Sequence, residues 1–381
     1  MKTSKWMSIV LSAVLLTGCG GNAGTSGTGT ESGTSASSGT SSVTLPAAEK
    51  TVTIASTPAQ KLAATMHEVN YGDLFTIRIP EGWQITAGGT EMFLWLRAYD
   101  PNEENLQVYA TLKSGYFLKN QSAKNYYQNA YELTGNKLLY GPSAALIVLE
   151  PATLEYFYQN YMEYIGILAE WEPPFAGFDY PRIDQFETIE ATDVNNALSS
   201  IALDNKMIHA SFVDPLSQLK GEGMFGGTVV DLITMTDPGF DCGFDTIYDL
   251  TAVTAPYGML GEYSELLTSI LSSVTYTDTY ITQVMQAQQI SMENARQIAA
   301  MTAETSSIIV DGWNARQKTY DIKSQEYSDA TLGYDRYLDT ETNQVYRAEY
   351  GSMDGYDGTR YQKIDQGSSY YTEPVAGYIL K

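Results

Sequence analysis

The chain has 381 residues, of which 43% are hydrophobic and 18% charged, and its formal net charge at pH 7 is −23. A surface this acidic is repelled by phosphate backbones, which argues against nucleic-acid binding and leaves cationic partners or simple solubility as the role of the charge. The length and the apolar fraction suffice for two domains, or for one large domain with an appendage.

The sequence holds little material for cysteine or histidine chemistry. It contains two cysteines, Cys19 and Cys242, and two histidines, His67 and His209. A disulfide framework is therefore not expected, and a lone thiol such as Cys242 is more often a small buried apolar residue than a nucleophile. No G-x-S-x-G, H-E-x-x-H or P-loop motif occurs in the sequence. The run Gly221-Glu-Gly-Met-Phe-Gly226 has G-x-G-x-x-G spacing but no helix signal after it and is better explained as a flexible turn, so no cofactor is predicted.

The first 19 residues have the pattern of a secretory signal. Lys2 and Lys5 precede an apolar run from Trp6 to Leu16, which is too short for a permanent membrane span of roughly 20 residues. The run ends in Leu16-Thr17-Gly18-Cys19.

This ending resembles the lipobox of bacterial lipoproteins. The resemblance implies signal-peptidase recognition at Leu16, Thr17 and Gly18, and a diacylglyceryl-type lipid on Cys19. It further implies a membrane-anchored protein on the outer face of the cytoplasmic membrane. With Cys19 lipidated, Cys242 has no intrachain partner, which fits a Gram-positive envelope.

Residues 20–45 are dominated by Gly, Ser and Thr and are predicted to be a disordered linker. A flexible chain of this length reaches about 25–30 Å, enough to hold a folded domain clear of the headgroups.

Residues 46–276 are predicted to form an α+β domain built as an antiparallel-sheet α/β sandwich. Alternating apolar residues predict strands, and apolar residues three and four apart predict helices with one buried stripe. The expected strands are 74–79, 92–98, 106–112, 207–213, 227–235 and 248–254, and the clearest helices are 153–170 and 262–272.

Two further segments follow this domain. Residues 277–329 lack proline and are rich in helix-forming residues, which predicts a long helix. Residues 330–381 are predicted to form a small C-terminal antiparallel β-hairpin region, with strands at 334–339 and 344–350.

Parts of the chain resemble known families. The run Phe75-Thr-Ile-Arg-Ile-Pro-Glu-Gly-Trp83, which leads into a strand-rich segment, resembles the opening of PsbP/Mog1-type α/β sandwiches. The run from Trp313 to Asp321, with Asp339-Thr-Glu-Thr-Asn-Gln-Val-Tyr-Arg347 and Pro374-Val-Ala-Gly-Tyr378, resembles uncharacterised lipoproteins of Gram-positive, Clostridia-like bacteria. Asn343 stands where a glycine is expected, and asparagine tolerates the left-handed conformation of such a turn. These resemblances imply a localisation and an architecture, and no activity.

Clustered aspartates are the candidate metal ligands. Asp237, Asp241 and Asp245 recur every four residues, and Asp354 and Asp357 share a turn. Oxygen-rich loops of this kind hold calcium, but neither cluster has EF-hand spacing, and solvated turn aspartates explain both equally well.

The 29 tyrosines allow two interpretations. Exposed tyrosines stack on wall sugars or form a protein interface, whereas the spacing of Tyr158 and Tyr161 favours core packing. The sequence thus favours a non-enzymatic, lipid-anchored binding or interaction protein, with an envelope protein or a wall sugar as partner. The alternatives are a cell-wall polymer hydrolase with paired carboxylates and a solute-binding lipoprotein.

Overall fold

A computed structural model describes residues 52–137, 139–175, 177–236, 238–288, 318–356 and 358–380. Its centre is a seven-stranded sheet in which every neighbouring pair is antiparallel. In spatial order the strands are β4 (Gln84–Gly88), β5 (Trp95–Asp100), β6 (Glu103–Leu118), β10 (Phe244–Pro256), β9 (Lys220–Ile233), β8 (Ala202–Val213) and β7 (Asp184–Asp193). The α+β class with mainly antiparallel strands is therefore confirmed.

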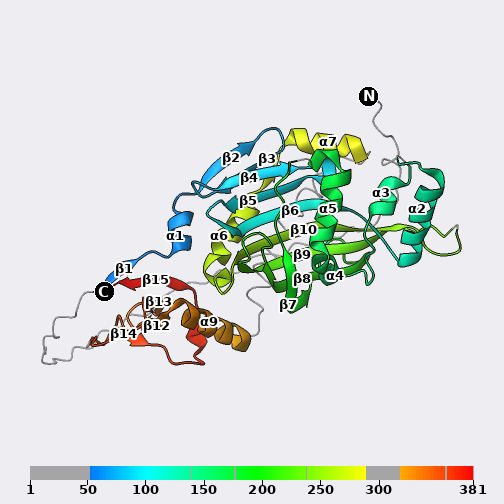
Figure 1. The fold of residues 1–381 in the computed structure, drawn as a ribbon. Coiled ribbons are helices and arrows are strands. Elements are labelled where there is room, and N and C mark those ends of the chain that lie inside the picture. Colours follow the sequence, from blue (N-terminus) through cyan, green and yellow to red (C-terminus); the bar gives the residue numbers. More distant parts are fainter. Residues whose placement is uncertain are drawn as a thin grey trace, which may run out of the picture.

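Each face of this sheet is covered by its own core (Figure 1). Along β6, Val108 and Ala110 enter one core while Tyr109 enters the other, as the alternation of a strand requires. One face packs against α6 (Leu260–Ser272), α7 (Asp278–Gln288), α1 (Pro58–Ala63) and the small sheet of β2 (His67–Tyr71), β3 (Phe75–Ile79) and β11 (Thr275–Tyr276). The other packs against α4 (Leu154–Gln159), α5 (Tyr161–Trp171) and the 3₁₀ turn η2 (Pro173–Phe175).

A third, smaller core lies at one end of the sheet, where α2 (Gln121–Thr134) and α3 (Gly141–Ala145) pack beside the β9–β10 hairpin. Asn120 is the N-cap of α2, because its side chain accepts a hydrogen bond from the N–H of Ala123 at 2.9 Å.

The predicted helix 153–170 is interrupted. Thr153 caps its start, since its hydroxyl accepts from the N–H of Tyr156 at 3.2 Å, and Trp171 ends it before two prolines. At Asn160, however, φ is −111°, which divides the segment into α4 and α5. Tyr158 and Tyr161, on either side of the break, both lie in the core, at 1% and 0% exposure.

The last part of the chain forms a separate five-stranded sheet, here called the C-terminal module. Its order is β1 (Thr53–Ala55), β15 (Val375–Leu380), β13 (Gln344–Glu349), β12 (Tyr334–Asp339) and β14 (Tyr361–Lys363). The helix α9 (Lys318–Leu332) and the 3₁₀ turn η3 (Ser369–Thr372) complete it. Between β12 and β13, Asn343 has a φ of 57°, in the left-handed region.

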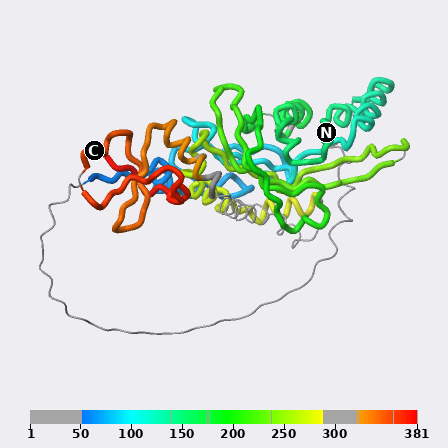
Figure 2. The backbone as a smooth tube through the Cα atoms, turned by 90° about the horizontal axis from the view of Figure 1, so that it is seen from below, coloured from blue at the N-terminus to red at the C-terminus, as the bar shows by residue number. Residues whose placement is uncertain are grey.

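Two features of this module have no local sequence signal. The strand β1 precedes the central sheet in the chain by some thirty residues, yet it pairs antiparallel with β15 at the other end of the chain. Figure 2 shows this blue strand beside the red C-terminal strand. In addition, β13 and β15 pair in parallel. Of the predicted long helix 277–329, the structure describes α7 and the first part of α9; residues 289–317 lie outside the described residues.

Candidate binding cavity at the module junction

Several predicted sites fall outside the described residues. These are the lipobox residues Leu16, Thr17, Gly18 and Cys19, and the calcium candidates Asp237 and Asp357. None of the described helices has both the length and the apolar composition that crossing a bilayer requires.

The structure describes the remaining three aspartate candidates, of which Asp241 is bonded within the protein. Asp241 accepts from Lys119 Nζ at 2.8 Å and from the N–H groups of Met235 and Gly243. Burial raises the pKa of Asp245 to about 6, and Lys119 only partly opposes this. Asp354 lies in a turn of the C-terminal module. Within the described ranges, no group of three or more His, Cys, Asp or Glu residues is arranged to hold a metal ion.

The tyrosine cluster around α4 and α5 belongs to the core. Tyr109, Tyr158 and Tyr164 are all at most 1% exposed, and the hydroxyls of Tyr109 and Tyr158 share a hydrogen bond of 2.8 Å. The interpretation of Tyr158 and Tyr161 as core residues is confirmed, so these rings offer no stacking surface. Cys242 is also buried, at 2% exposure, in the small core beside α2.

The most unusual charged group joins the C-terminal module to the body. It consists of Glu262 on α6, Asp329 on α9, Arg336 on β12 and Arg347 on β13, here called the junction cluster. The side chains of all four are at most 3% exposed. Sequence reasoning did not single out these residues, because nothing local marks an arginine on a strand as buried.

Arg347 is the centre of the junction cluster. Its two terminal nitrogens lie 2.6 Å from Glu262 Oε2 and 2.8 Å from Asp329 Oδ1. Arg336 binds the other oxygen of Asp329, the carbonyl of Tyr371 at 2.8 Å and the side-chain oxygen of Gln325 at 2.6 Å. Two guanidinium groups therefore balance two carboxylates, as buried charges require.

In the junction cluster, burial and the charges of neighbouring side chains shift the pKa values in opposite directions. Burial raises the pKa of Glu262, and Arg347 and the hydroxyl of Tyr378 only partly counter it. Burial also lowers the pKa of Arg336. For Arg347 burial acts in the same direction, but its two carboxylates outweigh burial and raise the pKa. The pair of Glu262 with Arg347 thus crosses between the body and the module, whereas the partners of Arg336 all belong to the module.

A cavity of about 830 Å³ lies beside this cluster, between the body and the C-terminal module. Its walls come from α1, α6, α9, β13 and the chain leading into β15, with Met224 and Val253 of the central sheet also contributing. Glu262, Arg336 and Arg347 are among the lining residues, whereas Asp329 is not. The volume is within the range of small-molecule sites, which are roughly 300–1,000 Å³.

The N-terminal arm forms one wall of the cavity. Thr57 and Gln60 make a capping box that starts α1. The side chain of Gln60 then donates to the carbonyl of Ala376, at the start of β15, at 3.1 Å. Because β1 pairs with β15 and α1 packs against α6, this arm spans the module junction.

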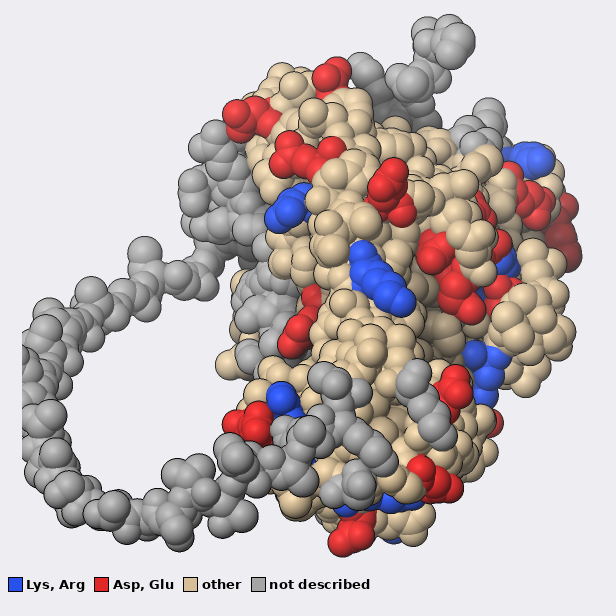
Figure 3. Space-filling view, turned by 90° about the vertical axis from the view of Figure 1, so that its left-hand side faces the viewer, with Lys and Arg blue, Asp and Glu red and all other residues tan. Residues whose placement is uncertain are grey.

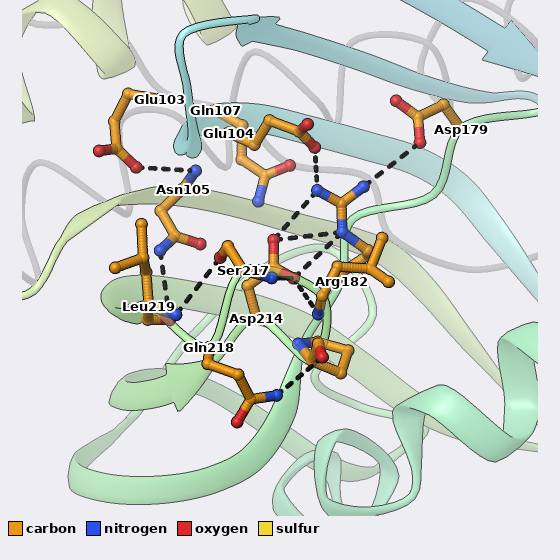
Figure 4. A network of polar contacts seen from close by, with 12 residues as sticks. Glu103, Glu104, Asn105, Gln107, Asp179, Arg182, Asp214, Ser217, Gln218 and Leu219 are labelled. Carbon is orange, nitrogen blue, oxygen red and sulfur yellow. Dashed lines mark hydrogen bonds and ion pairs between the residues drawn. The ribbon is translucent and has the colours of Figure 1, made fainter.

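A second ion cluster, the edge cluster, is only partly buried and does not line the cavity. It comprises Arg97, Glu104, Asp179, Arg182 and Asp214 and ties the β5–β6 turn to the segment before β7 and to the β8–β9 turn. Figure 4 shows Arg182 between Glu104, Asp179 and Asp214. We interpret this cluster as a structural tie between loops.

The chain matches no protein-family model and no curated protein. The junction cavity is therefore described from its geometry alone. It lies between the body and the C-terminal module, and α1 forms part of one wall.

Proposed function

We propose that this protein is a lipid-anchored extracytoplasmic binding protein, non-enzymatic, whose ligand occupies the cavity between the body and the C-terminal module. The signal-like pattern of residues 1–19, the lipobox resemblance at Cys19 and the Gly/Ser/Thr linker support anchoring at the outer face of the cytoplasmic membrane. The observation that carries the binding role is the cavity of about 830 Å³ with walls from both modules.

The state of the carboxylates favours binding over hydrolysis. A glycosidase needs two carboxyl groups facing each other across the substrate at about 5–9.5 Å, one of them free to act on it. Of the carboxylates that line this cavity, Glu262 is held by Arg347, and Glu265 and Glu373 are exposed to solvent rather than enclosed in a catalytic site. The polymer hydrolase is therefore the less favoured candidate.

A solute-binding lipoprotein is the second candidate, because a ligand site between two modules is the arrangement on which hinge closure acts. We further propose that the body is a PsbP/Mog1-like sandwich and that the C-terminal module is the hairpin region of the Clostridia-like lipoproteins. A central antiparallel sheet with elements on both faces supports the first, and the pairing of β12 with β13 supports the second.

The binding role is tested by filling the cavity. Thr268 lines it on α6 and bonds its hydroxyl to the carbonyl of Ser264, four residues earlier. Thr331 on α9 makes the same bond to Tyr327 but is exposed and does not line the cavity. The mature protein is screened by thermal shift against neutral oligosaccharides, amino acids, phosphorylated polyols and polyamines.

We expect at least one class to raise the melting temperature of the wild-type protein and of Thr331→Trp, but not that of Thr268→Trp. A ligand that stabilises both variants equally binds elsewhere and contradicts the proposal, as does release of products from a wall polymer by the wild-type protein.

The anchor is tested separately by membrane fractionation. Cys19→Ala should move the protein from the membrane fraction to the medium, because the thiol is the expected point of lipid attachment. If the variant remains in the membrane fraction, lipidation at Cys19 is not the tether.

A further inference from the structure

The charged groups of the cavity limit the charge of its ligand. The buried charges that line it, Glu262, Arg336 and Arg347, are already neutralised within the junction cluster. A buried anionic group on a ligand would therefore lack a counter-ion, which is costly in a desolvated site. Of the remaining lining residues, Glu265 and Glu373 are exposed and negative, and they repel anions.

The surface charge on this side of the molecule also disfavours an anionic ligand. Figure 3 shows acidic side chains spread among uncharged surface, with few basic side chains and no basic patch on the face in view.

The uncharged polar residues of the cavity offer hydrogen-bond donors. Gln325, Asn343 and Gln344 all line it. Each uses its side-chain oxygen within the protein: Gln325 accepts from Arg336 at 2.6 Å, Asn343 from Tyr370 at 3.3 Å and Gln344 from Tyr346 at 3.0 Å. No hydrogen bond from their NH₂ groups is made to the described part of the chain, and each such group carries two donors.

Arg347 adds one more donor. Its Nε is buried and has no hydrogen-bond partner among the described residues, although both of its terminal nitrogens are paired. The cavity therefore combines unused N–H donors with a lack of net positive charge. Groups that satisfy such donors without carrying charge are hydroxyl, ether and amide oxygens.

Apolar side chains form the rest of the lining. Met224, Val253, Leu260 and Leu266 contribute from the body, and Val345 and Pro374 from the module. A ligand that fits both kinds of wall has oxygen acceptors on its edges and carbon-bound hydrogens on its faces. This is the chemistry of a sugar ring.

We infer that the ligand of the junction cavity is a neutral carbohydrate, a short oligosaccharide held by the amide groups of Gln325, Asn343 and Gln344. This inference rests on the proposed function and specifies the class of its ligand. The Asn and Gln side chains supply the specificity, and the junction cluster holds β12 and β13 in the position that presents them.

The test is isothermal titration of the mature protein with four probes: N-acetylglucosamine oligomers of two to four units, maltotetraose, poly(glycerol phosphate) and spermidine. The double variant Gln325→Leu/Gln344→Leu removes two of the amide groups. The control is Gln128→Leu, on the exposed side of α2 and not part of the cavity lining.

We expect a neutral oligosaccharide to bind the wild-type protein and the control equally, and the double variant to bind it about tenfold or more weakly, from the loss of two hydrogen bonds. Circular dichroism confirms that the variants are folded.

If the anionic polymer or the polyamine binds and the double variant weakens it, the cavity is a ligand site but the carbohydrate inference is wrong. If no neutral oligosaccharide binds at 20 mM, or if the double variant binds it as well as the wild-type protein, the inference is likewise overturned.

Discussion

The junction cluster and the edge cluster contain similar residues but differ in how far their carboxylates reach water. In the junction cluster both carboxylates are at most 3% exposed. In the edge cluster Glu104 and Asp179 are 39% and 43% exposed, and only Asp214, at 3%, is buried. The cost of removing an arginine depends on what it leaves behind, so the same substitution should have different consequences in the two places.

The largest effect is expected at the centre of the junction cluster. Arg347→Ala leaves two buried carboxylates without their main counter-ion, and we expect a loss of about 3–5 kcal/mol in the free energy of unfolding. Urea denaturation followed by tryptophan fluorescence measures it, with Arg78→Ala, an exposed arginine on β3, as the control. A loss below about 1 kcal/mol would show that water reaches the carboxylates of the junction cluster. The two clusters would then not differ in the cost of removing an arginine.

Lys113 sharpens the comparison because it is a buried cation that has no carboxylate partner among the described residues. It is 2% exposed, and its Nζ lies 5.2–5.4 Å from the ring centres of Phe93, Tyr116 and Tyr248. Burial lowers its pKa to about 8. Since the unfolded chain holds this proton more tightly, the wild-type stability should rise between about pH 8 and pH 10.5.

Lys113→Met should therefore stabilise the protein at pH 7 by about 2–3 kcal/mol, and the advantage should vanish above pH 10.5 or so. Lys220→Met, in which an exposed lysine 4.2 Å from the ring of Tyr257 is replaced, serves as the matched control and should change little. If Lys113→Met is destabilising at pH 7, the three rings stabilise the ammonium by more than its burial costs.

A smaller effect is expected in the edge cluster. Burial favours a higher pKa for Asp214, but hydrogen bonds from Arg182 and from the N–H groups of Leu216 and Ser217 outweigh it and lower the pKa. Arg182→Ala leaves those N–H groups in place, so we expect a loss of about 1 kcal/mol. That stability should be present above about pH 4 and disappear as the pH falls. If Arg182→Ala lowers the free energy of unfolding as much as Arg347→Ala does, the prediction that the edge cluster loses less stability than the junction cluster is wrong.

The last effect concerns Asp245, a carboxylate whose Oδ1 is buried without a hydrogen-bond partner among the described residues. Its pKa is raised to about 6, so the folded state binds the proton more tightly and wild-type stability should fall as the pH rises from about 4 to 6. Asp245→Asn should raise stability at pH 7.5 by up to about 3 kcal/mol and leave it unchanged near pH 3.

Differential scanning fluorimetry across this pH range, with the exposed Asp73→Asn as control, measures the effect. An unchanged melting temperature at pH 7.5 would show that Lys119 neutralises Asp245 fully.

The sequence by itself determined the elements with a strong local period. The alternation in Phe75, Ile77 and Ile79 predicts β3, and the apolar stripe through Leu266, Leu267 and Ile270 predicts α6, because one face of each must leave water. Thr153 and the prolines after Trp171 set the two ends of the α4–α5 segment for equally local reasons. The lipobox-like ending at Cys19 remains a prediction from the sequence alone.

The tertiary structure decided which of these elements meet. Nothing near Thr53–Ala55 indicates that its partner is β15, and nothing near Arg336 or Arg347 indicates that charged strand residues are buried. Pairing between the two ends of a chain depends on the packing of everything between them, which a local pattern does not encode. The cavity, whose walls come from segments far apart in the chain, therefore exists only in the folded protein.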